Sequence, residues 1–256
     1  MLDMDGTIYY EDELIPGALD FFKLLKSQGK RYVFMTNNSS KSKTSYVEKL
    51  NHLGIDATEE DIASSVNATI LFLKSLKNKG NIYLVGTESF KDELISEGFT
   101  VVPIDYRGKN VDFVVVGFDT ELTYEKLVGA CYYVSRDFQY LATNCDLRCP
   151  VKDQKFIPDC GSITNMIAAA TGRNPVFLGK PDRAIVDYVA QHTGIPICDI
   201  ACVGDRLYTD IAVGINAGAT SICVLTGEAT RDEIVHSEFK PDYCFDSIAG
   251  LLNALK

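Results

Sequence analysis

Two acidic side chains near the start of the chain, Asp3 and Asp5, stand two positions apart, and Gly6 follows them directly. Residues two apart in an extended segment point to the same side, and a glycine lets the backbone turn tightly beside a ligand. Two carboxylates that share one crevice repel each other, and burying them without a partner is costly. A divalent cation resolves this conflict, and Mg²⁺, which prefers oxygen ligands, is the natural candidate. The pair therefore predicts a metal site.

Three further polar clusters carry groups that complement such a metal site. One offers the hydroxyl of Thr36 and the amide of Asn37, the second contains Lys180, and the third adds the carboxylates of Asp205 and Asp210. Carboxylates, a divalent cation, a lysine and neutral donors together form a site for a phosphoryl group. Each cluster alone could consist of ordinary turn or helix-cap residues, so the inference depends on all four meeting at one place.

The elements that position these clusters follow from the pattern of apolar residues. Short apolar runs that predict buried strands alternate with amphipathic stretches that predict helices. The apolar runs are residues 31–35, 82–85, 113–116, 139–142, 176–178, 200–203 and 221–225. Strands that alternate with helices indicate βαβ units and a largely parallel sheet. Because ligands bind beyond the carboxyl ends of such strands, polar clusters far apart in the sequence can meet there.

Helix boundaries are marked by proline, glycine and a capping pattern. Pro16 is expected to start a helix that buries Leu19, Phe22 and Leu25 on one face. Thr230, with a glutamate three residues later, predicts a capping box near the C-terminus. Glycines are expected to end the helices at Gly29, Gly54, Gly80, Gly98, Gly172, Gly194 and Gly218.

A second domain is expected inside the first. Residues 80–176 contain their own alternation of strands and helices, and this length suffices for a small independent α/β domain. The sequence contains no Pro/Ser-rich linker that would attach a second domain at one end of the chain. We therefore predict a core formed by residues 1–79 and 177–256, with residues 80–176 inserted into it.

The polar clusters stand in the order DMDGT (residues 3–7), TNNSS (36–40), GKP (179–181) and GDRLYTD (204–210). In this order they resemble the four motifs of the haloacid dehalogenase (HAD) superfamily. More narrowly, the chain resembles the phosphatases of the NagD and 4-nitrophenylphosphatase type, and the resemblance extends over essentially its whole length. It implies an α/β fold with a Rossmann-like parallel-sheet core and an inserted, smaller α/β cap domain of the C2 type.

The resemblance also implies roles for individual residues. Asp3 would be the nucleophile that forms an aspartyl-phosphate, and Asp5 the general acid toward the leaving group and then the general base for water. Thr36, helped by the backbone of Asn37, would hydrogen-bond the phosphoryl oxygens, and Lys180 would neutralise charge. Dehalogenases of the superfamily lack an acid at the position of Asp5, which favours a phosphatase.

The same resemblance implies the metal ligands and part of the substrate site. Mg²⁺ would be held by the Asp3 carboxylate, the Asp5 carbonyl oxygen, Asp205 and waters, with Asp210 ordering the outer shell. Substrate contacts are expected from Asn37, from Asn38 and, in the cap, from Gly161. The cap segment 158–162 is expected to face the leaving group; the alternative is a solvated loop with a helix N-cap at Ser162.

One feature departs from the family pattern. Only Met1 and Leu2 precede Asp3, where the family has a full apolar strand. Because a two-residue strand would anchor the nucleophile poorly, we expect the native chain to begin upstream of Met1.

Composition limits the classes of partner. The 256 residues include 35 acidic and 25 basic side chains, a net charge of −10, which argues against nucleic acid or an anionic membrane as the main partner. The apolar runs fall far short of the ~20 residues that span a bilayer. Eight cysteines scattered through the expected elements indicate reduced thiols and a cytoplasmic location. We expect a small phosphorylated metabolite as partner, and a monomer or homodimer.

The sequence thus predicts a Mg²⁺-dependent hydrolase of small phosphomonoesters, such as sugar phosphates, nucleoside monophosphates, pyridoxal phosphate or phosphoglycolate. One alternative is a receiver-like signalling module with a phosphorylated aspartate, against which the insertion and Asp5 argue. Another is a phosphotransferase or mutase, which would usually carry a smaller helical cap soon after the first motif. The sequence contains neither GxxxxGK[ST] nor GxGxxG, so a nucleotide kinase or dinucleotide enzyme has no support.

Overall fold

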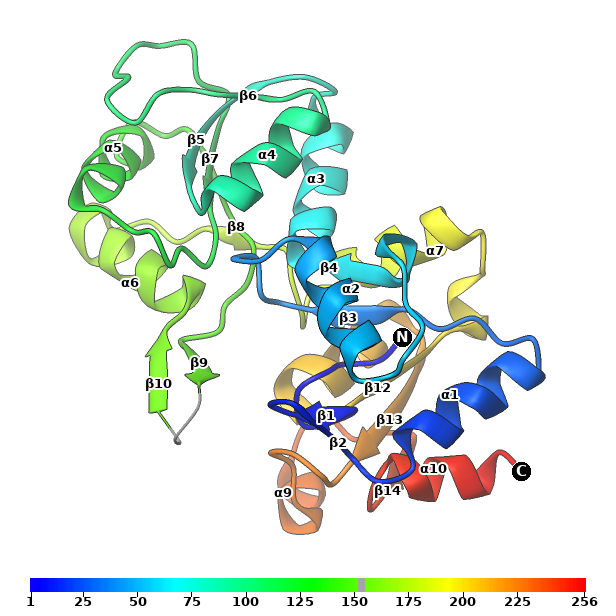
Figure 1. The fold of residues 1–256 in the computed structure, drawn as a ribbon. Coiled ribbons are helices and arrows are strands. Elements are labelled where there is room, and N and C mark those ends of the chain that lie inside the picture. Colours follow the sequence, from blue (N-terminus) through cyan, green and yellow to red (C-terminus); the bar gives the residue numbers. More distant parts are fainter. Residues whose placement is uncertain (152–154) are drawn as a thin grey trace. The chain divides into compact units, whose positions relative to one another are not determined.

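The sequence folds into two α/β units in the computed structural model, which describes residues 1–151 and 155–256 (Figure 1). The first unit comprises Met1–Thr36, Lys43–Ala63 and Lys180–Lys256, and the second comprises Asn37–Ser42 and Ser64–Gly179. The expected insertion, residues 80–176, falls within the second unit, which also takes in sequence on either side of it. None of the helices in the described ranges is both long and apolar enough to cross a bilayer.

The sheet of the first unit is held together by the residue that precedes Asp3. Leu2 forms parallel bridges to both Phe34 and Val203, and its N–H donates to the carbonyl of Val33 (2.8 Å). It joins the pair β3 (Phe34–Thr36) and β4 (Ile62–Ser64) to the parallel strands β12 (Ala201–Gly204), β13 (Thr220–Val224) and β14 (Tyr243–Phe245). The expectation that so short a segment would anchor Asp3 poorly is wrong, because it is hydrogen-bonded on both sides.

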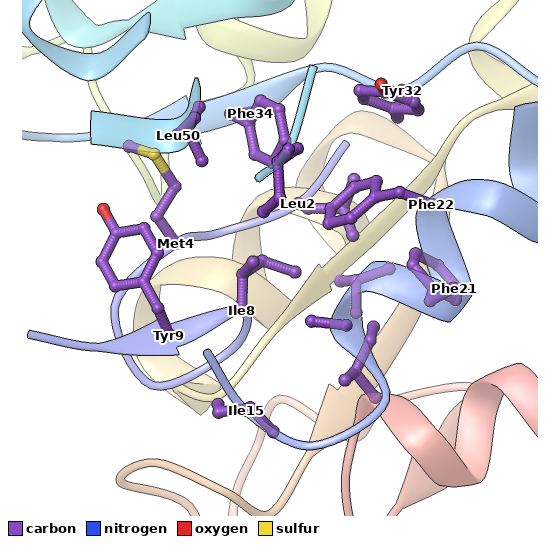
Figure 2. Close-up of a cluster of buried hydrophobic side chains, with 14 of the residues drawn as sticks. Leu2, Met4, Ile8, Tyr9, Ile15, Phe21, Phe22, Tyr32, Phe34 and Leu50 are labelled. Carbon is purple, nitrogen blue, oxygen red and sulfur yellow. The ribbon is translucent and has the colours of Figure 1, made fainter. Parts of the chain in front are cut away.

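A large apolar cluster packs on one face of this sheet (Figure 2). Helix α1 (Ala18–Ser27) contributes Phe21 and Phe22, and it packs against α10 (Ile248–Ala254). Leu19, which was expected on the buried face of α1, is 37% exposed. The unit also contains the helices α2 (Lys43–His52), α7 (Ala184–Thr193), α8 (Ala212–Ala217) and α9 (Arg231–His236), and the 3₁₀ turns η1 (Glu59–Asp61) and η2 (Ile197–Asp199).

The second unit is built on a five-stranded sheet in the order β11–β8–β7–β5–β6, in which all neighbouring strands are parallel. The strands are β5 (Asn81–Val85), β6 (Thr100–Val101), β7 (Phe113–Val116), β8 (Gln139–Ala142) and β11 (Val176–Phe177). Helices α3 (Ser65–Leu76) and α4 (Glu88–Ser96) lie on one face, and α5 (Tyr124–Val134) and α6 (Cys160–Thr171) on the other (Figure 1).

Alternation along these strands explains the two faces. Ile82 and Leu84 point into the cluster with α3 and α4, whereas Tyr83 and Val85 point into the cluster with α5 and α6. Side chains of successive strand residues point to opposite faces. A strand that is covered on both faces therefore reads as a continuous apolar run, as the sequence shows.

Several local elements differ from the sequence-based expectations. An antiparallel hairpin of β9 (Arg148–Val151) and β10 (Lys155–Pro158), which was not among the expected strands, precedes α6. A second small hairpin joins β1 (Tyr9–Tyr10) to β2 (Glu13–Leu14). Helix α3 ends at Leu76, not at Gly80. The capping box of Thr230 and Glu233 at the start of α9 is confirmed.

Candidate active site

Three carboxylates from distant parts of the chain converge in the first unit. Oxygen atoms of Asp3, Asp205 and Asp210 all lie within 4.8 Å of one another. Asp3 follows the bridge residue Leu2, Asp205 follows β12, and Asp210 lies in a π-helical turn, η3 (Leu207–Ile211). The carboxyl ends of adjacent parallel strands thus bring these acids to one place, as an open α/β sheet allows.

Lys180 lies among these acids. Its Nζ donates to Oδ1 of Asp3 and to Oδ1 of Asp210, both at 2.6 Å, and the residue is only 4% exposed. Burial alone would lower the pKa of Lys180, but the charges of Asp210 and Asp3 outweigh it and raise the pKa above its ordinary value. The side chain is therefore a permanent ammonium group between two carboxylates.

Lys180 and Arg206, which interacts electrostatically with all three acids, supply two positive charges against three carboxylates. Burial raises the pKa of Asp3 well above its usual range; Lys180 opposes this shift, whereas Asp210 and Asp205 add to it. Burial and then Asp210 raise the pKa of Asp205 to about 6. A group of three crowded oxygen donors with surplus negative charge fits a hard divalent cation such as Mg²⁺ or Ca²⁺, which binds carboxylate oxygens.

Backbone contacts hold Asp205 in this group. Its Oδ2 accepts the N–H of Glu228 at 2.8 Å, and its Oδ1 lies 3.4 Å from the Thr7 hydroxyl, which donates to it. A Cβ atom at Gly227 would lie 1.9 Å from Oδ2 of Asp205, and one at Gly6 would lie 2.9 Å from the same atom. The carboxylate is thus enclosed by backbone on two sides.

Asp210 is held in a similar way. Its Oδ2 accepts the N–H of Arg206 at 3.1 Å, while its Oδ1 accepts from Lys180. A Cβ atom at Gly204 would lie 2.2 Å from Cβ of Asp210. Both carboxylate oxygens of Asp210 are therefore engaged by protein donors, which suits a residue that orders its neighbours.

The other two predicted catalytic residues lie in the same unit. Asp5 is exposed and its backbone bridges to Tyr9, and Gly6 turns with a φ of 84° and donates its N–H to the Tyr9 carbonyl at 2.9 Å. The Asp5 side chain is not part of the three-carboxylate group found among the described residues. Thr36 is the last residue of β3 and is 9% exposed.

The three predicted substrate-binding residues lie in the second unit. Asn37 donates from Nδ2 to Oδ2 of Asp146 at 2.7 Å, and the N–H of Gly161 donates to the Asp146 carbonyl at 2.8 Å. Asn38 accepts with Oδ1 from the N–H and the hydroxyl of Ser40. Asn37 and Gly161 thus share Asp146 as a neighbour.

Gly161 is at the first turn of α6, not in a loop. A Cβ atom there would lie 2.3 Å from the Cys145 carbonyl oxygen, so only glycine fits this close backbone approach. The N-cap of α6 is Asp159, whose side chain accepts the N–H of Cys160, so the alternative of an N-cap at Ser162 is wrong.

The segment after β13 also belongs to the site, although it was not predicted from the sequence. Thr226 donates from its hydroxyl to the Gly6 carbonyl at 2.6 Å, and Gly227 and Glu228 enclose Asp205 as described above. The signal was present, because Thr226 and Gly227 follow the apolar run 221–225 just as the other clusters follow theirs.

Comparison with known proteins agrees with this arrangement. A model of the haloacid dehalogenase-like hydrolases matches residues 1–100, and a HAD-hydrolase-like model matches residues 177–251. The chain is 34% identical over 248 residues to the 5'-nucleotidase YutF of Bacillus subtilis, a match covering 97% of this chain and 94% of that protein. The chain belongs to the HAD superfamily. An acid sugar phosphatase of Staphylococcus haemolyticus is 33% identical over 256 residues, covering 100% of this chain and 95% of that protein.

Solved structures of HAD proteins extend the agreement over the whole chain. A 4-nitrophenylphosphatase from Thermotoga maritima superposes with a TM-score of 0.92 and 42% identity, covering 100% of this chain and 96% of that one. A glycerol phosphate phosphatase from Mycobacterium tuberculosis in complex with calcium gives a TM-score of 0.91 at 28% identity, covering 98% and 73%.

These matches confirm the expected α/β fold of the NagD type, with parallel sheets and a cap domain. They also confirm that this HAD protein is a phosphatase that acts on phosphomonoesters. A receiver-like signalling module and a phosphotransferase or mutase, the alternatives left open by the sequence, gain no support from them.

Proposed function

We propose that this phosphatase is Mg²⁺-dependent and that it hydrolyses its substrates through a phosphorylated Asp3. The observation that carries the proposal is the convergence of Asp3, Asp205 and Asp210 within 4.8 Å around the ammonium group of Lys180. Asp3, the Asp5 carbonyl oxygen and Asp205 would hold the metal, with Asp210 in the outer shell. When bound, Mg²⁺ would neutralise the crowded carboxylates and the negative charge on the phosphoryl oxygens.

The residues divide the reaction into two displacements. In the first, a carboxylate oxygen of Asp3 bonds to phosphorus while the bond from phosphorus to the ester oxygen breaks, and Asp5 gives a proton to the leaving alkoxide. In the second, Asp5 takes a proton from water, whose oxygen bonds to phosphorus and releases inorganic phosphate from Asp3. Splitting one difficult displacement into two easier steps is the advantage of covalent catalysis.

Lys180 and Thr36 support both displacements. Because Lys180 stays charged, it favours the ionised form of Asp3 against the effect of burial, holds this side chain in place, and reduces the repulsion between the carboxylate and a phosphate dianion. The chain carries a net charge of −10, so attraction of the dianion depends on such local positive charge. The Thr36 hydroxyl and Asn37 would bind the phosphoryl oxygens, with further substrate contacts from Asn38 and Gly161.

The substrate class follows from the relatives. Curated relatives include a 5'-nucleotidase and an acid sugar phosphatase, and solved relatives include phosphatases of 4-nitrophenyl phosphate and glycerol phosphate. We infer that the substrates are small phosphorylated metabolites, with sugar phosphates and nucleoside monophosphates first among them.

The organisation of the chain completes the proposal. A catalytic core of residues 1–79 and 177–256 would carry the acids and Lys180, and the inserted cap, residues 80–176, would select the leaving group. We further propose a cytoplasmic protein that acts as a monomer or homodimer.

Phosphate release over a panel of metabolites, in Mg²⁺ and in EDTA, tests this proposal. We expect release from several small phosphomonoesters in Mg²⁺ and loss of activity in EDTA that added Mg²⁺ restores. Equal rates in EDTA and in Mg²⁺ would refute the metal role.

A further inference from the structure

The loop after β13, residues 225–229, joins the two segments that supply Asp3 and Asp205. On one side, the Thr226 hydroxyl donates to the Gly6 carbonyl at 2.6 Å, and the Tyr10 hydroxyl donates to the Thr226 carbonyl. On the other side, the N–H of Glu228 donates to Oδ2 of Asp205, and that of Ala229 donates to its carbonyl at 2.9 Å. The loop therefore contacts both the backbone and the carboxylate of Asp205.

Gly227 brings the backbone of the loop into close steric contact with the Asp205 carboxylate. A Cβ atom at this position would lie 1.9 Å from Oδ2 and 2.3 Å from Cγ of Asp205, so any other residue would have to displace the Asp205 carboxylate. Gly227 does not have a positive φ, so its backbone conformation is open to other residues. Glycine is needed here only because the Asp205 carboxylate is so near.

Side chains at the π-helical turn that follows Asp205 contact the loop. The Glu228 carboxylate forms an ion pair with Nε of Arg206 at 3.2 Å and accepts from the Tyr208 hydroxyl at 3.3 Å. Glu228 also lines a cavity of about 320 Å³ together with Tyr208 and Ala229, so this side of the loop is not filled by packed side chains. The Glu228 side chain is 51% exposed, so its contacts with Arg206 and Tyr208 are polar contacts at the surface.

We propose that residues 225–229 are a positioning loop for the metal ligand Asp205, and that the contacts of Glu228 with Arg206 and Tyr208 hold the loop in place. The N–H of Glu228 fixes one carboxylate oxygen of Asp205, and Gly227 fixes its orientation by contact. Partners that orient a metal ligand contribute strongly to metal affinity. This inference depends on the proposed metal role of Asp205.

The first test is Gly227→Ala, with Gly250→Ala as the matched control. Gly250 lies in α10, has no positive φ, and a Cβ there would only touch Phe245 at 3.4 Å. We expect Gly227→Ala to weaken Mg²⁺ binding, measured by calorimetry without substrate, by about ten- to a hundredfold. Gly250→Ala should bind Mg²⁺ as the wild type does.

The second test removes the side-chain contacts of Glu228 and leaves the backbone of the loop unchanged. It does not depend on whether Gly227→Ala folds. Glu228→Ala keeps the backbone N–H that binds Asp205 but removes the contacts with Arg206 and Tyr208. We expect a smaller loss of Mg²⁺ affinity, which Glu228→Gln partly restores because its amide oxygen can still accept from Tyr208. In both folded variants, saturating Mg²⁺ should recover most of kcat, and KM for 4-nitrophenyl phosphate should change little.

The outcomes distinguish the two proposals. If the wild type does not bind Mg²⁺, the proposed metal role fails. If the wild type binds Mg²⁺ and both Gly227→Ala and Glu228→Ala bind it equally well, the positioning loop is refuted. A loss of thermal stability in Glu228→Ala with unchanged Mg²⁺ affinity would also refute it, since that result indicates a purely structural contact.

Discussion

Lys180 Nζ donates a hydrogen bond of 2.6 Å to Oδ1 of Asp3, although the two residues are separated by 177 positions in the sequence. The lysine is almost completely buried, so solvent cannot readily replace Asp3 as its partner. A buried ion pair is costly to break from one side, because the remaining charge is left without compensation. The relationship between these two residues links the stability of the unit to its chemistry.

Replacing Lys180 by Met should therefore abolish activity and destabilise the metal-free protein by about 3–5 kcal/mol, less whatever the acids recover by taking up a proton. Urea unfolding in EDTA measures the loss. Lys126→Met is a matched control, because Lys126 pairs with the buried Asp119 at 2.8 Å in the second unit. The control should lose stability but keep its activity while folded. An active Lys180→Met variant would contradict the role given to Lys180.

The raised pKa of Asp205, about 6, predicts how pH affects the metal-free protein. Because the unfolded chain ionises this residue at its ordinary, lower pKa, the folded state binds the extra proton between the two values. The contribution of Asp205 to stability is therefore complete at low pH and is lost as pH rises through about 6. Mg²⁺ affinity should show the opposite trend and fall below pH 6, because the ion requires the carboxylate.

Unfolding in EDTA at several pH values, for the wild type and Asp205→Asn, measures this contribution. The free energy of unfolding of the wild type minus that of Asp205→Asn should decrease as the pH rises from 4 toward 7. A difference that does not vary with pH would contradict the shifted pKa of Asp205.

Asp205 and Asp210 should differ in their importance for the metal. Both oxygens of Asp210 accept short hydrogen bonds, from Lys180 (2.6 Å) and from the N–H of Arg206 (3.1 Å), whereas Oδ1 of Asp205 accepts only a long one from Thr7 (3.4 Å). Asp205→Ala should therefore weaken Mg²⁺ binding more than Asp210→Ala, as measured by calorimetry. If Asp210→Ala weakened Mg²⁺ binding more, Asp210 would be the direct ligand and Asp205 the residue of the outer shell.

Asp5→Asn should spare substrate binding and slow both chemical steps, by about 10²–10⁴-fold. The asparagine keeps the carbonyl oxygen of the backbone but cannot exchange a proton. Pre-steady-state measurements with glycerol phosphate, whose alkoxide leaving group needs a proton, separate glycerol release from phosphate release. If only one of the two steps slows, Asp5 does not serve both as acid and as base.

Much of the fold could be predicted because the strands of the second unit are covered on both faces. Runs such as 113–116 are then apolar throughout and unmistakable. The hairpin of β9 and β10 was missed for the opposite reason, since its apolar residues Val151, Phe156 and Ile157 are exposed and show no buried face. The ability of Leu2 to anchor Asp3 was underestimated, because it depends on hydrogen bonds to two neighbouring strands. Such bonds cannot be read from the sequence.

The acids and Lys180 could be found from the sequence because each belongs to a polar cluster that comes after an apolar run or a strand. The loop at residues 225–229 was overlooked because it acts through backbone N–H groups and a glycine rather than through charged side chains. Asp146, which links Asn37 and Gly161, was also missed. Its importance lies in contacts between segments far apart in the chain, and no spacing rule shows them.

The most direct test of the account is the rate of Asp3→Asn with 4-nitrophenyl phosphate in Mg²⁺. The amide keeps the shape of the side chain but removes the nucleophilic charge. We expect a folded protein, by circular dichroism and thermal unfolding, whose kcat is at least about 10³-fold below that of the wild type. A folded Asp3→Asn variant with a kcat close to the wild-type value would show that Asp3 is not the nucleophile.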